Sequence, residues 1–438
     1  MDWAQHETLA KEWSEVVVGY ATAINAFVDR GMRLGWDKAG DEPFDDRGEA
    51  LAPGVVHVLR EANAAGHWRE LRERFPPAHA PFVPFLERQG LEIHSITWIA
   101  DDAVVATVGP QHEQTTTMRF GLDGETQVLL GVIAVGRVGD WFAIVREHDI
   151  ELRQGWDAAP ARRVPLPTGL EDIPERKGVS IDAPDRRWLV SVQPLSDGSG
   201  ALVVLHEGVF VSTASGVRRL YPEPAALAEE LDEAEDGRFT PYYDMIHAAL
   251  SPDGKHVACG SQDSQHLIFT IAGECISRFG PVHSSYPHHA AWSGDGKAAC
   301  FNSCHFYNGA TVGADLAKLR GLEIEEYEES KKLHLIDDHM RVYASAWLGD
   351  AWALGDAGGY VKAVTPKGEH AWQHFIGSTI GGIARSPDGS KLAVGTAAGF
   401  LSFVDMRSEQ KDPSVIGTAG FRELLRYIVW KGEPIWRW

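Results

Sequence analysis

ALSPDGKHVACGS, residues 249–261, has two close relatives later in the chain, AWSGDGKAACFNS at 291–303 and ARSPDGSKLAVGT at 384–396. Each copy has small or apolar residues, then a tight turn containing Asp-Gly, then a run that ends near a small polar residue. Asp can cap such a turn with its side chain and Gly adopts a positive φ, so the pair suits a short hairpin connection. Alternating apolar residues on both sides predict that each turn joins two strands.

Weaker copies of the turn are marked by the same aspartate. They are TWIADDAVVATVG around Asp102, AVGRVGDWFAIVR around Asp140, SIDAPDRRWLVSV around Asp185 and SAWLGDAWALGD around Asp350. With Asp253, Asp295 and Asp388, these aspartates mark seven turns at intervals of 38 to 68 residues. The two longest intervals contain acidic inserts at 222–237, which favours a helix, and at 319–334. Without the inserts the period is close to the roughly 40 to 50 residues of a propeller blade.

Seven such units predict an all-β fold, a seven-bladed β-propeller in which four-stranded sheets ring a central channel. The alternative is an eight-bladed ring whose degenerate eighth blade comes from the termini. The turns, of which SPDGK at 251–255 is the clearest, resemble those of the bacterial WD40-like propellers of unassigned function. The resemblance covers roughly residues 91–410 and implies a propeller domain over that range.

Residues 1–90 are predicted to form an N-terminal α-helical extension packed on the propeller. Apolar residues from Leu9 to Val28 recur at intervals of three and four, which is one face of a long helix, and 55–75 predicts a second helix that ends at two prolines. Docking of a partner is the alternative role for these helices. The segment 411–438 carries Trp430, Trp436 and Trp438 and is predicted to be tied to the propeller, because three free indoles in water would invite association.

Charge, hydrophobicity and cysteine content limit the classes of partner and the cellular location that we expect. The formal net charge of -21 disfavours nucleic acid, which proteins bind by displacing counterions with Lys and Arg, and favours a basic protein as the partner. The N-terminus does not have the pattern of a signal peptide, and the chain contains no run of 18 apolar residues. The four cysteines are too sparse to staple a chain of 438 residues. We therefore expect a cytoplasmic protein with reduced thiols and no membrane contact.

Candidate site residues follow from propeller geometry. In each repeat, residues shortly before the turn and residues eight to ten after it should meet at one face of the ring. In the fourth and fifth repeats these stretches are rich in histidine, whereas in the seventh they are mostly Gly and Ala. A few polar groups at the end of a channel are typical of a binding site. The predicted binding residues are His247, Asp263, His288, His289, Cys304, His305 and Tyr343.

The residues leave three functions open. His247, His289, Cys304 and His305 could converge on a metal, but their spacing matches no compact metal motif, so we predict neither a metal nor a cofactor. The chain also has no G-x-S-x-G, P-loop or H-E-x-x-H signature. The leading hypothesis is a non-enzymatic scaffold for protein binding, in a narrower form an acidic inhibitor, immunity protein or defence-complex subunit with a basic partner. A hydrolase or lyase with a His-rich, metal-binding channel mouth is the alternative, and a ligand-sensing propeller is the third.

Overall fold

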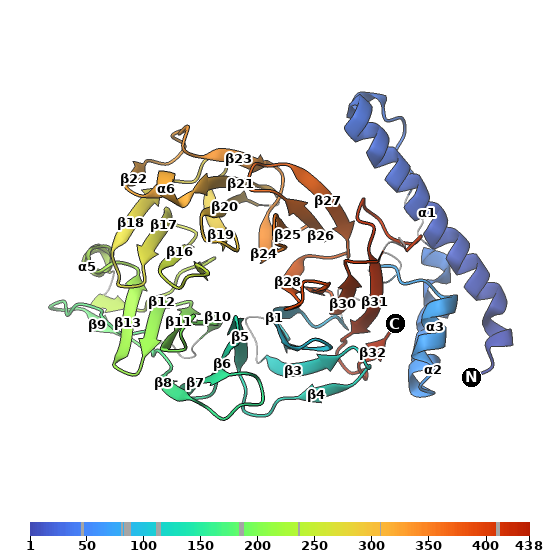
Figure 1. The fold of residues 1–438 in the computed structure, drawn as a ribbon, viewed down its shortest axis with the longest axis horizontal. Coiled ribbons are helices and arrows are strands. Elements are labelled where there is room, and N and C mark those ends of the chain that lie inside the picture. The colour runs from blue at the N-terminus through green and yellow to red at the C-terminus, as the bar shows by residue number, and fades with distance from the viewer. Residues whose placement is uncertain are drawn as a thin grey trace.

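The computed structural model describes residues 1–44, 48–79, 82, 89–110, 115–183, 188–234, 237–306, 308–408 and 412–438. Within these residues, seven sheets of four or five strands stand side by side around a central channel, as Figure 1 shows. The predicted seven-bladed β-propeller is therefore confirmed, and the eight-bladed alternative is wrong. Within the same residues, none of the helices combines the length and the apolar composition that crossing a membrane requires.

The first three blades are built from strands that follow one another in the chain, the first strand lying innermost. Blade 1 contains β1 (Ile93–Ala100), β2 (Ala103–Val108), β3 (Thr116–Gly121) and β4 (Thr126–Val128). Blade 2 contains β5 (Ala134–Val138), β6 (Trp141–Val145), β7 (Asp149–Gln154) and β8 (Arg162–Pro165). Blade 3 contains β10 (Leu189–Pro194), β11 (Gly200–Leu205), β12 (Gly208–Thr213) and β13 (Gly216–Tyr221).

The remaining blades follow the same plan with two additions at the outside. Blade 4 contains β15 (His247–Leu250), β16 (His256–Gly260), β17 (His266–Thr270), β18 (Cys275–Phe279) and the added β22 (Leu322–Ile324). Blade 5 contains β19 (Tyr286–Trp292), β20 (Ala298–His305), β21 (Asn308–Asp315) and β23 (His334–Asp337). Blade 6 contains β24 (Val342–Trp347), β25 (Trp352–Asp356), β26 (Tyr360–Val364) and β27 (His370–Phe375). Blade 7 contains β28 (Ile380–Arg385), β29 (Lys391–Thr396), β30 (Phe400–Asp405), β31 (Arg422–Ile428) and the added β32 (Trp436–Arg437).

The repeated turn joins the first two strands of a blade and satisfies its own polar groups. The Ser251 hydroxyl donates to the Asp253 carboxylate at 2.6 Å, and that carboxylate accepts the Lys255 N–H at 3.1 Å. Ser251 Oγ in turn accepts the His256 N–H at 2.9 Å, while Gly254 has a φ of 71°. The copies at Ser293 and Ser386 repeat this network, which explains why the motif recurs in the sequence.

The turn of blade 3 lies elsewhere than predicted. Asp185 falls outside the described residues, and the turn between β10 and β11 contains Asp197, whose carboxylate accepts the Ser199 N–H at 2.9 Å. Gly198, with a φ of 68°, occupies the left-handed position of this turn. The strand after Asp185 is therefore the innermost strand of blade 3 and not its second, so the Asp185 marker was wrong.

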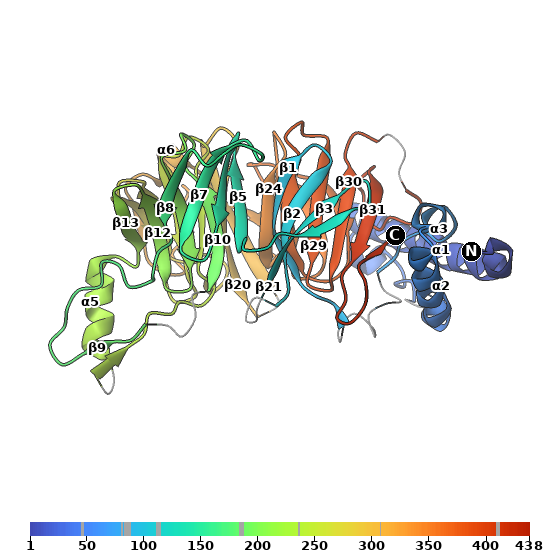
Figure 2. The same ribbon diagram turned by 90° about the horizontal axis from the view of Figure 1, so that it is seen from below.

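The two acidic inserts leave the ring differently. The first contains a helix as predicted, α5 (Pro224–Glu233), which buries Leu227 and Leu231. It is followed by β14 (Arg238–Phe239), which pairs in parallel with β9 (Ser180–Ile181), and Figure 2 shows α5 and β9 projecting from one face of the ring. The second insert follows the short helix α6 (Leu316–Leu319) and places β22 in parallel beside β18. A segment that follows β21 of blade 5 thereby adds a fifth strand to blade 4.

The N-terminal helices lie along the outer edge of blade 7 (Figure 1). They are α1 (Glu7–Leu34), α2 (Ala52–Ala64) and α3 (Trp68–Arg74), with the 3-10 turns η1 (Trp3–His6), η2 (Trp36–Lys38) and η3 (Glu49–Leu51). The single helix predicted at 55–75 was wrong, because Gly66, with a φ of 75°, separates α2 from α3. Trp13 of α1 packs against Phe82 and Trp438, at ring-centroid distances of 6.0 and 6.3 Å, within a shared apolar core.

The ring closes where blade 7 meets blade 1. Within the described residues these two blades share no strand, and Trp98 of blade 1 packs edge-on to Phe403 of blade 7 at 5.6 Å. The chain that follows β31 returns to the start of blade 1, where the Leu91 N–H donates to the Val429 carbonyl at 2.9 Å. The C-terminal segment thus supplies the fourth strand of blade 7 and also crosses the seam.

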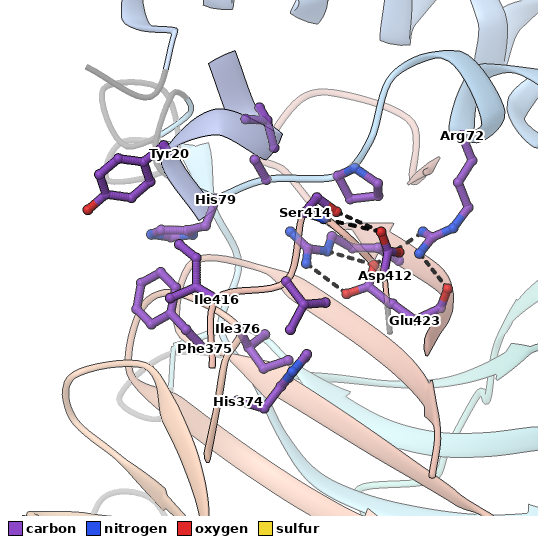
Figure 3. Close-up of a pocket in the computed structure, with 15 residues that line it drawn as sticks. Tyr20, Arg72, His79, His374, Phe375, Ile376, Asp412, Ser414, Ile416 and Glu423 are labelled. Atoms are coloured by element: carbon purple, nitrogen blue, oxygen red, sulfur yellow. Dashed lines mark hydrogen bonds and ion pairs between the residues drawn. The ribbon is translucent and has the colours of Figure 1, made fainter. Parts of the chain in front are cut away.

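A buried ion cluster ties helix α3 to β31 of blade 7 (Figure 3). Arg426 donates two hydrogen bonds, of 3.1 and 2.7 Å, to the Glu423 carboxylate. Arg72 of α3 donates to the same carboxylate at 3.2 Å and to the main-chain oxygen of Trp438 at 2.6 Å. Burial raises the pKa of Glu423, but the two guanidinium groups outweigh it and lower the pKa to about 2. Glu423 is therefore ionised at neutral pH, and its carboxylate joins helix α3 to β31.

We expect Arg72→Met to destabilise the protein by about 3 to 5 kcal/mol, because it removes one partner of a buried ion cluster. The measurement is the free energy of unfolding in urea. Arg74→Met is the matched control, since Arg74 is exposed on the same helix and should cost little. Equal stability of the two variants would show that the cluster does not hold the helices to the ring.

Candidate functional site

The first strand of every blade begins at the same face of the ring, which we call the mouth face. Because the first two strands are antiparallel, the second strand returns to this face, and Tyr286 at the start of β19 pairs with Cys304 near the end of β20. In blade 4, His247 pairs with Gly260 in the same way. The repeated Ser-Asp turns lie at the opposite end of the same strands. The mouth face therefore carries the starts of the first strands, and the opposite face carries the repeated Ser-Asp turns.

A cavity of about 630 Å³ occupies the channel below the mouth face. Its lining comes mainly from the first strands of the blades and includes His94, His206, His247, His288, His289 and Arg341. This volume lies in the range of small-molecule sites, which are of roughly 300 to 1,000 Å³. Residues separated by more than 240 positions in the chain are thus gathered around one space.

Main-chain carbonyl groups fix the protonation pattern of three channel histidines. His247 Nδ1 lies 2.9 Å from the Met245 carbonyl, and His288 Nδ1 lies 2.6 Å from that of Val342. His94 Nε2 lies 3.0 Å from the Gly109 carbonyl. A carbonyl oxygen only accepts, so each of these nitrogens carries the proton, and in the neutral ring the other nitrogen is an acceptor.

Four of the channel histidines are held neutral. Burial lowers the pKa of His247 to about 4 and those of His288 and His289 to about 3, and it also lowers the pKa of His94. The carbonyl that accepts from His247 or from His288 acts in the opposite direction but does not compensate for the lost hydration. At neutral pH the site therefore presents lone pairs and N–H groups without imidazolium charge.

Tyr343 connects the channel with the surface of the mouth face. Its side chain is 37% exposed, and its ring meets that of His288 edge-on at a centroid distance of 4.6 Å. The Arg341 guanidinium lies over the Tyr343 ring at 5.1 Å and donates to the Phe306 carbonyl at 2.5 Å. These contacts join blade 5 to blade 6 at the rim.

The remaining predicted residues lie outside the cavity lining. Cys304 is buried with Sγ 3.9 Å from Met245 Sδ, and burial raises the pKa of its thiol. His305 is exposed beside Tyr286, with Nδ1 3.1 Å from Ser285 Oγ, and Asp263 is exposed between β16 and β17. Within the described residues, no group of three His, Cys, Asp or Glu side chains is arranged to hold a metal ion.

Three residues of the cavity escaped the sequence prediction. His94 lies near the start of β1, as His288 lies near the start of β19, but the predicted residues all belong to the fourth, fifth and sixth repeats. Arg341 lies two residues before Tyr343, farther from the turn at Asp350 than the stretch that the prediction used. His206 lies in the connection between β11 and β12. Because the turn of blade 3 was misplaced at Asp185, the prediction did not assign this connection to the mouth face.

Strained backbone surrounds the mouth. Ser95, Met245 and Phe306 have φ values of 52°, 54° and 51°, in the left-handed region that bulky side chains avoid. Each lies at the mouth-face end of a first or second strand, whereas the turns at Asp253, Asp295 and Asp388 place Gly at their left-handed position. Strain of this kind is typical of segments that present side chains for binding.

A second cavity lies between the helices and blade 7, beside the Glu423 cluster (Figure 3). Its volume is about 40 Å³, which suits water and is too small for an organic ligand. Tyr20 and His79 lie at one side of it and Arg72 and Glu423 at the other. The channel is therefore the better candidate for a functional site.

Comparisons with known proteins give a similarity in fold and no match in sequence. No protein-family model matches this chain, and no curated protein matches its sequence. Among solved structures, the β-propeller domain of Cps50 (Swd1) from Myceliophteria thermophila is similar with a TM-score of 0.46 and 13% sequence identity, over 70% of this chain and 93% of that chain. Nothing about function is taken from this likeness. Kinship with the bacterial WD40-like propellers stays a prediction.

The lowered pKa of His247 predicts a loss of stability in mild acid. In the unfolded chain its pKa is near 6.5, so below that pH the unfolded state binds more protons than the folded state. The contribution is complete above about pH 6.5 and falls as the pH falls toward 4, by about 2 kcal/mol between pH 7 and pH 5. We expect His247→Asn, which keeps a donor for Met245, to show a smaller stability difference between these pH values than the wild type. Urea titrations measure it, and an unchanged difference would contradict a neutral, buried His247.

Proposed function

We propose that the protein is a non-enzymatic cytoplasmic scaffold whose mouth face docks a second protein with a basic surface. The observation that supports this most is the presence of three exposed aromatic side chains in segments at the mouth face. Tyr242, Phe306 and Tyr343 are 49%, 71% and 37% exposed. Aromatic residues and Arg are the residue types that contribute most to binding energy at protein interfaces.

These side chains are pre-positioned. Tyr242 stacks on His206 with a centroid distance of 4.9 Å and an interplanar angle of 8°. Phe306 lies beside His305, at 4.6 Å, and its carbonyl is held by Arg341. Ordered side chains lose less conformational entropy when a partner binds, so more of the contact energy appears as affinity.

The charge around the same face suits a basic partner. Projecting α5 exposes Glu229, Asp232 and Glu233, and residues 325–329 expose four glutamates beside Tyr327. Tyr327 is linked to the mouth face by a hydrogen bond from its N–H to the Pro281 carbonyl. Together with the net charge of -21, this distribution favours association with a cationic surface through long-range attraction.

A narrower form of the proposal names the kind of partner. An acidic face with aromatic anchors is what an inhibitor or immunity protein needs to cover a basic toxin, and it also suits a subunit that joins a basic neighbour in a defence complex. Binding in either form should weaken as salt rises, because surface charges are screened.

Affinity capture with three baits tests the proposal. The wild type and Lys297→Ala, an exposed change on the opposite face, should recover the same protein in stoichiometric amount. Phe306→Ser combined with Tyr343→Ala should lose it, because two anchors are removed and each costs about 1 kcal/mol or more. Equal recovery by all three baits would place the interface elsewhere, and recovery of no partner by the wild type would contradict the scaffold proposal.

A further inference from the structure

A further cavity, of about 460 Å³, lies at the face with the Ser-Asp turns, opposite the mouth face. It is formed where the first strands of blades 7, 1 and 2 end. Trp98 near the end of β1, Arg137 near the end of β5 and Arg385 at the end of β28 are part of its lining. Its volume lies in the range of roughly 300 to 1,000 Å³ that is usual for small-molecule sites.

Arg385 is a cation that the fold does not use. Its guanidinium lies against Gly389, and within the described residues it forms no hydrogen bond and no ion pair. Nε is buried, whereas Nη1 and Nη2 remain accessible. The carboxylate of Asp388 is already held by the Ser386 hydroxyl at 2.6 Å and by Arg407 at 3.7 Å. A guanidinium that is partly removed from water without a partner is costly, so this position favours an anion.

Arg137 of blade 2 faces the same cavity in a fixed position. Its Nε donates to the Gly139 carbonyl at 2.7 Å, and its Nη1 donates to the Trp98 carbonyl at 2.9 Å. The guanidinium also lies over the Phe142 ring, 4.9 Å from the centroid. These contacts order the side chain but supply no carboxylate, and in the described part of the chain Nη2 has no hydrogen-bond partner.

The lining of this cavity has a surplus of positive charge. Among its described residues, Arg137, Arg385 and Asp140 are the charged ones, and Asp140 forms no ion pair with either arginine. Burial lowers the pKa of the Arg137 guanidinium, and the attraction of the Asp140 carboxylate does not compensate for it. The chain has 62 acidic and 41 basic residues, so a local surplus of cations runs against its composition. An anion between the two guanidinium groups would relieve their repulsion.

We propose that this cavity binds a small organic anion whose carboxylate or phosphate group pairs with Arg385 and Arg137. The planar guanidinium group matches two oxygens of either acid group. Ala384 and Pro387 line the same cavity and can contact the apolar part of the molecule, for which an inorganic ion would leave the space to water. The site lies away from the mouth face and does not depend on the proposed protein partner.

Isothermal titration calorimetry of the whole chain tests the proposal, at pH 7 and constant ionic strength in a buffer without phosphate. Benzoate and phenyl phosphate are the anionic probes, and benzamide is the neutral probe that matches benzoate in shape. We expect at least one anion to bind saturably and about tenfold or more tightly than benzamide. The tighter of the two anions identifies the acid group that the site prefers. No saturable binding of either anion, or equal binding of benzamide, would overturn the proposal.

Three variants locate the site. Arg385→Met should weaken binding of the preferred anion about tenfold, because it removes the free guanidinium. Arg407→Met is the matched control, since Arg407 lies on the same face outside the cavity lining and pairs with Asp388, and binding should be unchanged. Asp140→Asn should tighten binding about twofold or more, because it removes a negative charge from the lining.

If Arg385→Met does not fold, Arg385→Lys replaces it, with weaker binding expected because lysine lacks the two-pronged geometry. Unchanged binding by the Arg385 variant would place the anion elsewhere and overturn the proposal. None of these results affects capture of a protein at the mouth face, so the two proposals fail separately.

Discussion

A buried carboxylate, Glu423, lies between two guanidinium groups on β31 of blade 7, and the attachment of the helices to the ring depends on this contact. Within the described residues, blades 7 and 1 share no strand, so their side-chain packing and the chain that crosses the seam must keep the ring shut. Arg72 attaches the helices to blade 7. Arg426 anchors β31, from which the C-terminal segment continues to the apolar core that it shares with the helices. The helices, which the sequence predicted to pack on the propeller, also reach blade 1, where Arg69 of α3 donates to the Asp123 carbonyl at 3.1 Å.

Closure creates the candidate site, because no single blade contains it. His94 comes from the first blade, His247 and His288 from the middle of the chain, and the lining extends to Ile383 in the last blade. A rigid ring fixes these side chains at low entropic cost and excludes enough water to keep the histidines neutral. The mouth face and the channel then offer two surfaces of different chemistry, one aromatic and acidic, the other neutral and rich in hydrogen-bonding groups.

The fold could be predicted because Ser251, Asp253 and Gly254 form a turn whose hydrogen bonds are local. Each copy of the turn needs the same residue types, so the turn appears in the sequence as a repeated pattern. The error at Asp185 has the same origin, since the sequence at 184–192, a Pro-Asp pair before an apolar run, imitates that pattern. The site could be predicted only in part. His247, His288, His289 and Tyr343 line the cavity, but Cys304 points into the contact with Met245 and His305 stays at the surface. Strand pairing shows which residues share a face, whereas their side-chain directions depend on bulges near the strand starts, such as that between Pro287 and His289.

The central claim is that the mouth face, and not the face with the Ser-Asp turns, is the surface that binds the partner protein. Amide hydrogen exchange of the protein with and without its captured partner measures this directly. We predict slower exchange at residues 242–247 and 304–306 in the complex, with unchanged exchange at the turns 251–256 and 293–298. Protection of those turns with an unchanged mouth would contradict the account.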